Sequence, residues 1–279
     1  MAKQTKPVKI GQQVIGGSEF AVIAGPCSIE SADHFREVAT AVQKSGAVLL
    51  RGGMFKLRTS PESFQGLGSE AYHLVKKIKQ EVGLGFISEV TDPRQIADFI
   101  PLVDAFQVGS RNMHNYDLLK ELGHTRTPVL LKRGFSGLIK EWLLAAEYLI
   151  RGGNEQVVLC ERGIRTFETA TRNTFDLNAV AYIKEHTPFP IIADPSHATG
   201  ETALVAPMAL AAAAAGADGL MIEVHPRPSE ALSDGFQALT YLQFDQLMQQ
   251  LSRLLPTLGR EMAVRHKVGP IYSTYTAEV

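Results

Sequence analysis

The chain has 279 residues, and its 28 Lys and Arg nearly balance its 29 Asp and Glu, so the formal net charge is −1. Proteins that bind nucleic acids or anionic membranes show a basic excess, so we expect neither kind of partner. Two cysteines are too few for a disulfide framework, and the longest apolar stretch is short and interrupted by Pro207. With 45% hydrophobic residues for a buried core, the composition predicts an enzyme of the cytoplasm.

Short apolar runs rich in β-branched residues recur along the chain, and a segment with helical periodicity follows each of them. The runs occupy residues 21–24, 47–50, 85–88, 104–108, 128–131, 156–159, 190–193 and 218–222. Their starts lie about 28 residues apart, which is the length of one βα unit. Eight such units favour a single (β/α)8 barrel of the TIM type in the α/β class over the alternative, a doubly wound sheet.

The predicted barrel covers residues 21–255 and leaves one segment at each end. Residues 1–20 form an N-terminal extension, in which two short strands around Gly16 and Gly17 suggest a β-hairpin that closes the barrel floor. Residues 256–279 form a C-terminal tail that has no periodic pattern.

Several residues inside the barrel have expected structural roles. Asp92 followed by Pro93 predicts a helix N-cap and the first helical residue. An apolar stripe that begins at Phe244 predicts the last helix. We expect Cys160 to lie in the core, and His34, on a helix, to be exposed to solvent.

Active sites of parallel barrels form at the carboxyl ends of the strands, so the residues that follow each run are candidates for function. Every run is followed by a charged or strongly polar residue. The cations among them are Arg51, Lys56, Arg58, Arg111, Lys132, Arg133 and Arg162. Converging Arg and Lys side chains bind phosphate and carboxylate oxygens, which predicts two anionic substrates or one with two anionic groups. The alternative is a set of salt bridges with Glu89, Glu161 and Asp194.

A second set of polar residues has the chemistry of metal ligands. It consists of Cys27, His197, Glu223 and Asp234, which follow the first, seventh and eighth runs. These runs become neighbours when a barrel closes. A thiolate, an imidazole and two carboxylates suit Mn, Fe, Co, Zn or Cu better than Mg or Ca. The alternative for Cys27 is a small buried hydrophobic residue.

Seven ordered motifs over roughly residues 20–255 carry a resemblance to a known family. They are GPCS at 25–28, RGGMFKLRTSPESFQGLG at 51–68, QVGSRN at 107–112, LLKRG at 130–134, CERGIRTFE at 160–168, DPSHATG at 194–200, and EVHP at 223–226 with SDG at 233–235. Together they resemble the 3-deoxy-D-arabino-heptulosonate 7-phosphate (DAHP) synthases, which catalyse the first step of the shikimate pathway. The resemblance is to the short, type I beta form that has no regulatory domain.

The resemblance implies a condensation of phosphoenolpyruvate with erythrose 4-phosphate that releases phosphate and needs one divalent metal ion, Mn²⁺, Fe²⁺, Co²⁺ or Zn²⁺. It assigns the metal to Cys27, His197, Glu223 and Asp234. It assigns phosphoenolpyruvate to Arg51, Lys56, Arg111, Lys132 and Arg162, and the sugar phosphate to Arg58 and Thr59. Lys56 is expected to assist proton transfer with a lowered pKa, because other cations surround it. The further catalytic candidates are Cys27, Glu89 and His197. The resemblance also implies a homodimer or homotetramer, and it makes a chorismate mutase a candidate partner.

Two departures from the family pattern concern the loop that meets the sugar. Leu57 replaces a usual proline, and Glu62 adds a negative charge. The spacing before the arginine still favours the four-carbon sugar, and Cys27 stands where metal-independent octulosonate enzymes have asparagine. Three alternatives stay open. They are a 3-deoxy-octulosonate 8-phosphate synthase that uses arabinose 5-phosphate, a Schiff-base aldolase with Lys132 as nucleophile, and a non-catalytic barrel that binds sugar phosphates.

Overall fold

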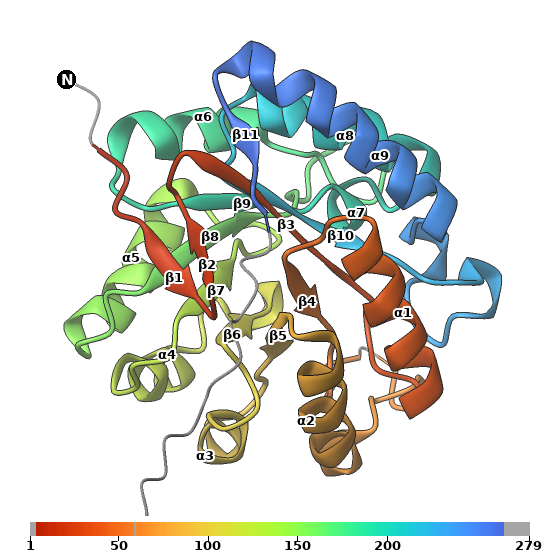
Figure 1. Cartoon of the computed structure of the whole chain (residues 1–279). Coiled ribbons are helices and arrows are strands. Elements are labelled where there is room, and N and C mark those ends of the chain that lie inside the picture. Colours follow the sequence, from red (N-terminus) through yellow and green to blue (C-terminus); the bar gives the residue numbers. More distant parts are fainter. Residues whose placement is uncertain (1–3, 59, 265–279) are drawn as a thin grey trace, which may run out of the picture.

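The computed structural model describes residues 4–58 and 60–264, and a closed ring of eight parallel strands lies at the centre of this part (Figure 1). The strands of the ring are β3 (Glu19–Gly25), β4 (Leu49–Arg51), β5 (Gly85–Glu89), β6 (Ala105–Val108), β7 (Val129–Lys132), β8 (Val157–Glu161), β9 (Ile191–Ala193) and β10 (Gly219–Glu223). β10 pairs with β3 from Gly219 opposite Ala21 to Glu223 opposite Gly25, which closes the ring. The predicted barrel and its eight strands are therefore confirmed.

Helices surround the ring of strands (Figure 1). They are α1 (Ala32–Lys44), α2 (Ala71–Val82), α3 (Ile96–Phe99), α4 (Tyr116–Gly123), α5 (Ile139–Arg151), α6 (Leu177–His186), α8 (Thr202–Ala214) and α9 (Tyr241–Leu254), with a short additional helix α7 (Pro195–Thr199) directly after β9. The stripe that begins at Phe244 is buried, as expected for the last helix. The Asp92 carboxylate accepts a hydrogen bond from the backbone N–H of Arg94 and so caps the turn that begins at Pro93, as predicted.

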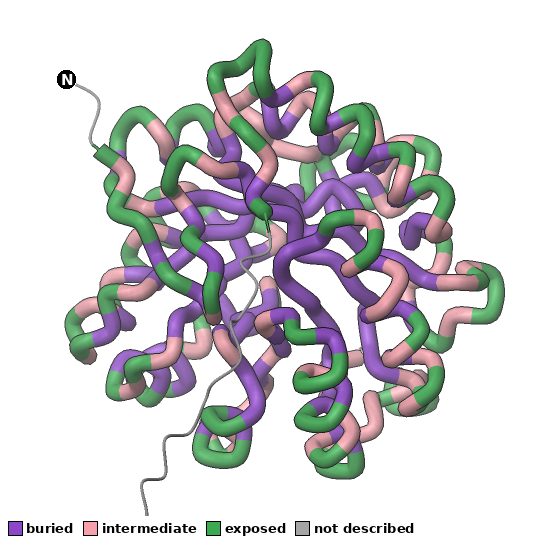
Figure 2. The backbone as a smooth tube through the Cα atoms, viewed as in Figure 1, coloured by how far each residue is buried: buried purple, intermediate pink, exposed green. Residues whose placement is uncertain are grey.

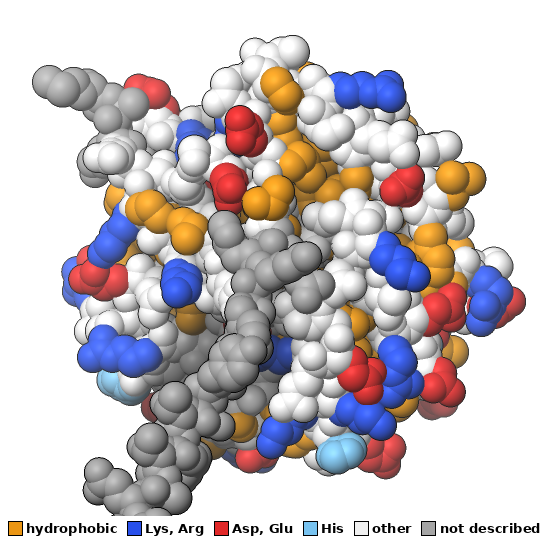
Figure 3. Space-filling view, viewed as in Figure 1, with side chains coloured by type: hydrophobic (Ala, Val, Ile, Leu, Met, Phe, Trp, Pro, Cys, Tyr) orange, Lys and Arg blue, Asp and Glu red, His pale blue; other side chains and the backbone are white. Residues whose placement is uncertain are grey.

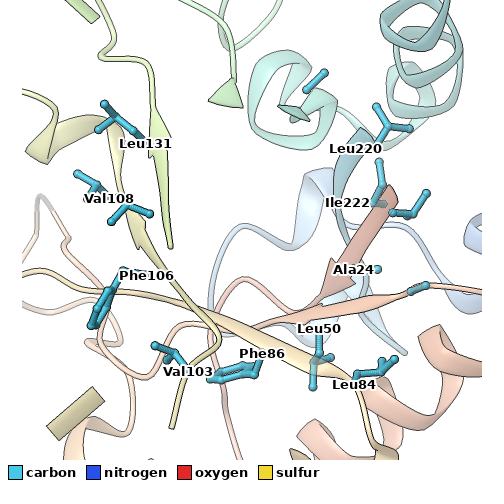
Figure 4. Packing of buried hydrophobic residues seen from close by; sticks show 14 of the residues in the cluster. Ala24, Leu50, Leu84, Phe86, Val103, Phe106, Val108, Leu131, Leu220 and Ile222 are labelled. Carbon is cyan, nitrogen blue, oxygen red and sulfur yellow. The ribbon is translucent and has the colours of Figure 1, made fainter. Parts of the chain in front are cut away.

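Two apolar layers hold the strands in place, because alternate side chains of each strand point to opposite faces. The outward-facing layer packs against the helices, and Figure 4 shows part of it around Phe86, Phe106 and Leu131. The inward-facing layer fills the barrel and includes Ile87 and Cys160, which lies in the core as expected. Figure 2 shows the result, with buried strands in the centre and exposed turns and helix faces outside.

A β-hairpin covers the amino end of the barrel (Figure 1). It consists of β1 (Val8–Ile10) and β2 (Gln13–Ile15), which pair antiparallel. Val8, Ile10 and Ile15 are buried in the same cluster as the inward-facing barrel residues. The turn lies at Gly11, with φ +58, rather than around Gly16 and Gly17 as predicted. Gly16, with φ +90, instead leads the chain towards β3.

The described part of the C-terminal segment also contacts the barrel. A 3-10 turn, η6 (Leu255–Leu258), is followed by a short strand β11 (Glu261–Met262), which pairs in parallel with the start of β3. Residues 265–279 of the predicted tail lie outside the described residues. On the face shown in Figure 3, charged side chains of both signs are interspersed. Within the described part of the chain, no helix has the length and apolar character needed to cross a membrane.

Candidate active site

The carboxyl ends of the strands surround a cavity of about 290 Å³. The predicted site residues that line it are Arg51, Lys56, Arg58, Glu89, Arg111, Lys132, Arg162, His197 and Asp234. The two other predicted metal ligands, Cys27 and Glu223, contact residues of this lining. Thr59 lies outside the described residues. Residues spread over most of the sequence therefore meet at one rim, as the strand-end argument predicts.

Three of the four predicted metal ligands, Cys27, His197 and Asp234, have ligand atoms within 4.8 Å of one another, and the fourth, Glu223, lies next to His197. The Sγ atom of Cys27 lies 3.2 Å from Oδ2 of Asp234 and 3.9 Å from Nε2 of His197. Nε2 of His197 lies 3.6 Å from Oε2 of Glu223. Such separations are close to those between neighbouring ligands of one transition-metal ion, whose bonds to protein atoms are about 2.0–2.3 Å long. The arrangement follows from the pairing of β9 with β10 and of β10 with β3.

Local backbone geometry places Asp234. In the described part of the chain it is the one non-glycine residue with a left-handed backbone, at φ +52. Short polar side chains tolerate this conformation better than bulky ones. The next residue, Gly235, leaves no room for a side chain, because a Cβ there would lie 2.0 Å from the carbonyl oxygen of Pro228. The loop after β10 can therefore return Asp234 to the rim.

A buried carboxylate lies beside His197, and Oδ1 of Asp194 caps the helix that carries it by accepting a hydrogen bond from the backbone N–H of His197 at 3.0 Å. Nδ1 of His197 lies 2.9 Å from Oδ2 of Asp194, and Nζ of Lys132 donates a hydrogen bond to the same oxygen at 2.6 Å. Burial lowers the pKa of His197 to about 3, so the imidazole is neutral and Nε2 is free to bind a metal. Although burial raises the pKa of Asp194, His197 and Lys132 hold it well below its usual value.

Gln237 and Arg172 also belong to the site, although no sequence motif assigns either residue to it. Nε2 of Gln237 donates to Oε2 of Glu223 at 2.7 Å, and Nη1 of Arg172 donates to Oε1 of Gln237 at 2.6 Å. Gln237 is fully buried. Arg172 and Glu223 thus fix the orientation of its amide, so that the NH2 group faces Glu223. The only sequence signal is its place three residues after Asp234.

Lys56 has the opposite pKa shift to the one predicted. Its ammonium group contacts Sγ of Cys27 and lies 3.2 Å from Oδ2 of Asp234. Burial alone would lower the pKa of Lys56, but Cys27, Asp234 and Glu223 outweigh burial and raise it. The expectation of a lowered pKa is therefore wrong, because the acidic groups around Lys56 have the larger effect on it.

Burial also raises the pKa of two of the metal ligands. It raises the pKa of the Cys27 thiol to about 11, with a further contribution from Glu223 and against the influence of Lys56 and Arg51. It raises the pKa of Glu223 to about 7, although Arg51 opposes this shift. For Asp234, the Lys56 ammonium outweighs burial, and its pKa is lowered.

The cations of the site differ in how fully they are paired. Arg51 is buried, and its Nε and Nη1 atoms have no hydrogen-bond partner among the described residues. Arg162 is also buried, and burial lowers its pKa to about 10. Donors of this kind are expected where an anionic ligand completes the site.

Arg133, included among the predicted cations of the rim, does not line the cavity. Its guanidinium is buried in ion pairs of 2.9 Å with Glu161 and 2.8 Å with Asp176. Lys132 and Arg133 are consecutive, so their side chains point to opposite faces of the barrel wall. For Arg133 the alternative of a structural salt bridge is therefore correct, and Lys132, which does line the cavity, also forms the salt bridge with Asp194 that this alternative names. Glu89 does line the cavity, where its carboxylate accepts a hydrogen bond from Gln107 at 3.0 Å.

A second group of potential ligands consists of Glu30, His34 and His225. Nδ1 of His225 accepts a hydrogen bond from the backbone N–H of Arg227 at 3.1 Å, which places the ring proton on Nε2, 3.5 Å from Glu30. A protonated nitrogen offers a metal no lone pair, so His225 is paired with Glu30, whereas the ring nitrogens of His34 have no hydrogen-bond partner among the described residues. The expectation that His34 is solvated is wrong, because its ring packs on that of His225 at a centroid distance of 4.5 Å and burial lowers its pKa.

With this geometry established, comparisons with known proteins identify the family. The profile of the DAHP synthetase I family matches residues 3–257. The chain belongs to the DAHP synthetase I family. Members of this family are enzymes, and the alternative of a non-catalytic binding barrel is therefore excluded.

Individual members of the family and more distant relatives are also similar to the chain. A phospho-2-dehydro-3-deoxyheptonate aldolase of Thermotoga maritima is 44% identical, over 90% of this chain and 75% of the relative. A 2-dehydro-3-deoxyphosphooctonate aldolase of Syntrophobacter fumaroxidans is 29% identical, over 86% of this chain and 88% of the relative.

Solved structures agree with this assignment. The crystal structure of the Thermotoga maritima phospho-2-dehydro-3-deoxyheptonate aldolase has a TM-score of 0.90 at 42% identity, covering 93% of this chain and 76% of the other. A truncated 3-deoxy-D-arabino-heptulosonate 7-phosphate synthase of the same organism has a TM-score of 0.87 at 39% identity, covering 93% and 95%. The chain thus has the barrel of DAHP synthases, as the sequence motifs predict.

Proposed function

We propose that this enzyme condenses phosphoenolpyruvate with erythrose 4-phosphate and water to give DAHP and inorganic phosphate, and that it needs a divalent transition metal ion. One observation carries the proposal. A single cavity holds both a group of buried cations suited to anionic substrates and a neighbouring set of sulfur, nitrogen and oxygen ligands.

The four converging side chains fit a metal ion. Cys27, His197, Glu223 and Asp234 would hold Mn²⁺, Fe²⁺, Co²⁺ or Zn²⁺, since a thiolate, an imidazole and carboxylates are ligands of these ions. The ammonium of Lys56 contacts two of the same atoms, which indicates that this group of ligands attracts a cation. When bound, the metal would supply Lewis-acid polarisation of the sugar aldehyde.

The cations of the cavity would bind phosphoenolpyruvate. This role falls to Arg51, Lys56, Arg111, Lys132 and Arg162. The Nε and Nη1 atoms of Arg51 have no hydrogen-bond partner among the described residues, and Nη1 lies 3.9 Å from Oε2 of Glu223, so each N–H group is a donor that an oxygen of the substrate would satisfy. Because its pKa is raised, Lys56 would carry a proton at neutral pH and act as a donor to an oxygen of the substrate rather than as a base.

The bond changes of the proposed reaction balance with these groups. C3 of phosphoenolpyruvate forms a bond to the aldehyde carbon, whose oxygen takes up a proton and becomes a hydroxyl. Water adds to C2, the bond from C2 to the phosphate oxygen breaks, and inorganic phosphate leaves as C2 becomes a ketone. Lys56 would deliver a proton, and Glu89 would accept one from the attacking water.

Arg58 would bind the phosphate of the sugar, because it lines the same cavity as the proposed phosphoenolpyruvate site. The four-carbon sugar is the better candidate, since the heptonate aldolase is 44% identical to this chain and the octonate aldolase only 29%. Schiff-base chemistry at Lys132 is disfavoured, because its amine donates to the buried Asp194 carboxylate at 2.6 Å. A nitrogen held in this contact is not free to attack a carbonyl carbon.

Phosphate release from phosphoenolpyruvate, with erythrose 4-phosphate or arabinose 5-phosphate and with or without EDTA, tests the proposal. We expect turnover with the four-carbon sugar that EDTA abolishes and Mn²⁺ restores. Turnover with arabinose 5-phosphate alone would overturn the choice of sugar, and full activity in EDTA would overturn the metal requirement. Cys27→Ala should abolish metal-restored turnover, whereas Cys160→Ala, at the other buried cysteine, should retain it.

We further propose that the enzyme works in the cytoplasm as a homodimer or homotetramer, and we retain a chorismate mutase as a candidate partner. A thiolate ligand needs a reducing compartment, which supports the proposed location. Sedimentation of the purified chain, alone and with a chorismate mutase, tests the assembly. A monomer that does not associate with the mutase would contradict both proposals.

A further inference from the structure

One aromatic ring lies among the cations of the cavity. The Cζ atoms of Arg111, Arg162 and Arg165 lie 5.3, 4.8 and 4.7 Å from the centroid of the Phe135 ring. All three distances are within the range, about 6 Å, at which the face of an aromatic ring attracts a guanidinium. Phe135, Arg111 and Arg162 all line the cavity.

The barrel topology brings these residues together. β7 lies between β6 and β8, and Phe135 is in the loop that follows β7. Arg111 comes from the 3-10 turn η3 (Ser110–Asn112) after β6, and Arg162 directly follows β8. The backbone N–H of Arg165 donates to the carbonyl oxygen of Phe135 at 2.6 Å, which joins the two loops. The ring is thus held between arginines from both neighbouring strands.

The two buried arginines of this region have different partners. Arg133 forms ion pairs with two carboxylates. Arg162 is only 3% exposed, and among the described residues it forms no salt bridge and donates only a long bond of 3.4 Å to the carbonyl oxygen of Gly163. A carboxylate beside Arg162 would hold the guanidinium but would also cancel its charge and repel an anionic substrate. An aromatic ring attracts the guanidinium without a net charge.

We propose that Phe135 is a positioning residue that holds Arg111 and Arg162 at the cavity while leaving their positive charge available to an anionic group of the substrate. This inference rests on the proposed function, and it adds the residue that orients part of the phosphoenolpyruvate site. Phe135 itself carries no charge and takes no part in proton transfer.

Site-specific replacement of Phe135 by mono-, di- and trifluorophenylalanine tests the inference. Each fluorine withdraws electron density from the ring face with little change in its size, so it weakens attraction to a cation. We expect the dissociation constants of phosphoenolpyruvate and of inorganic phosphate to rise stepwise, by about tenfold for three fluorines. KM for phosphoenolpyruvate should rise more than kcat falls.

Replacements by standard amino acids provide controls for the fluorine series. Phe135→Leu should weaken binding by about tenfold, and Phe135→Trp should retain it, because indole is the best ring for this attraction. Phe244→Leu, at a buried ring on α9, should leave the dissociation constants unchanged. A flat fluorine series would overturn the inference even if Phe135→Leu weakens binding, because the ring would then act only by filling space.

The same measurements separate the inference from the proposed function. Turnover by the wild-type enzyme together with a flat fluorine series would overturn only the role of Phe135. If the wild-type enzyme shows no turnover but phosphate binding weakens with each fluorine added at Phe135, only the proposed reaction would be overturned. Failure of the wild-type enzyme to bind either anion would overturn both.

Discussion

The ammonium nitrogen of Lys56 lies 3.2 Å from Oδ2 of Asp234 and also contacts Sγ of Cys27. Two of the four proposed metal ligands thus bind the ammonium of this lysine. A divalent ion needs the same two atoms and is repelled by the positive charge, so the ion and Lys56 compete for this position.

Replacing Lys56 should therefore strengthen metal binding while abolishing turnover. For Lys56→Met we expect the Mn²⁺ or Zn²⁺ dissociation constant to fall by roughly tenfold in competition with a chelator. Lys79→Met is the matched control, because Lys79 forms its 2.7 Å ion pair with Asp104 outside the cavity. Weaker metal binding by Lys56→Met would show instead that the ammonium stabilises the ligand arrangement.

Loss of the Gln237 amide should weaken metal binding. Gln237→Met removes the 2.7 Å hydrogen bond that orients Glu223. Losing such a contact to a metal ligand typically costs about 10–100-fold in affinity. The visible absorption of bound Co²⁺ should change with the geometry of the ligands.

A buried amide elsewhere is the control for Gln237. Asn154 is 1% exposed and donates to backbone atoms away from the cavity. Asn154→Leu should lower the stability of the fold without changing the metal dissociation constant. Equal metal affinities of wild type and Gln237→Met would contradict the orienting role.

Metal affinity should rise with pH. Thiol and carboxyl groups bind a metal in their deprotonated forms, and burial raises the pKa of Cys27 to about 11 and that of Glu223 to about 7. Protons therefore compete with the metal at Cys27 up to high pH, and also at Glu223 below about pH 7. The affinity for the metal should increase about tenfold for each pH unit above pH 7, and more steeply with pH below pH 7.

Dissociation constants measured from about pH 6 to 9, with the protons released on binding counted by calorimetry, test this dependence. Glu223→Gln should remove the steeper part below pH 7 and weaken binding overall. A dissociation constant that does not change with pH would show that the ligands are already deprotonated.

The hairpin at the floor should contribute to stability and not to catalysis. Ile15 is fully buried in the inner cluster, so Ile15→Ala should lower the free energy of unfolding by about 2–5 kcal/mol. Val14 on the same strand is 43% exposed, and Val14→Ala should change the free energy of unfolding by about 0.5 kcal/mol or less. Denaturant unfolding measures both values. A change in KM of folded Ile15→Ala would contradict the separation of floor and site.

The sequence predicts the barrel and most of its rim because both depend on local patterns. Apolar runs mark the strands, and a residue that follows a strand must lie near the rim. The prediction that Arg133 faces the cavity is wrong for a reason that lies in the finer geometry of the strand. Lys132 and Arg133 both follow the same run, and only the alternation of side chains across the strand separates the cavity residue from the buried ion pair.

Gln237 and Arg172 were missed for a different physical reason. Both lie in loops, and their contacts depend on loop backbone conformation, such as the left-handed φ of Asp234. No periodic pattern reports where two loops meet. The direction of the Lys56 pKa shift was missed likewise, because it depends on distances to Cys27 and Asp234 that spacing along the chain does not give.

The raised pKa of Cys27 has a consequence for oxidative damage. Thiolates react with oxidants and alkylating agents, whereas protonated thiols are nearly inert. With its pKa near 11, Cys27 stays protonated at neutral pH when no metal is bound. We therefore expect the sulfur of a metal-free enzyme to react slowly with oxidants, so that metal ions supplied later restore activity.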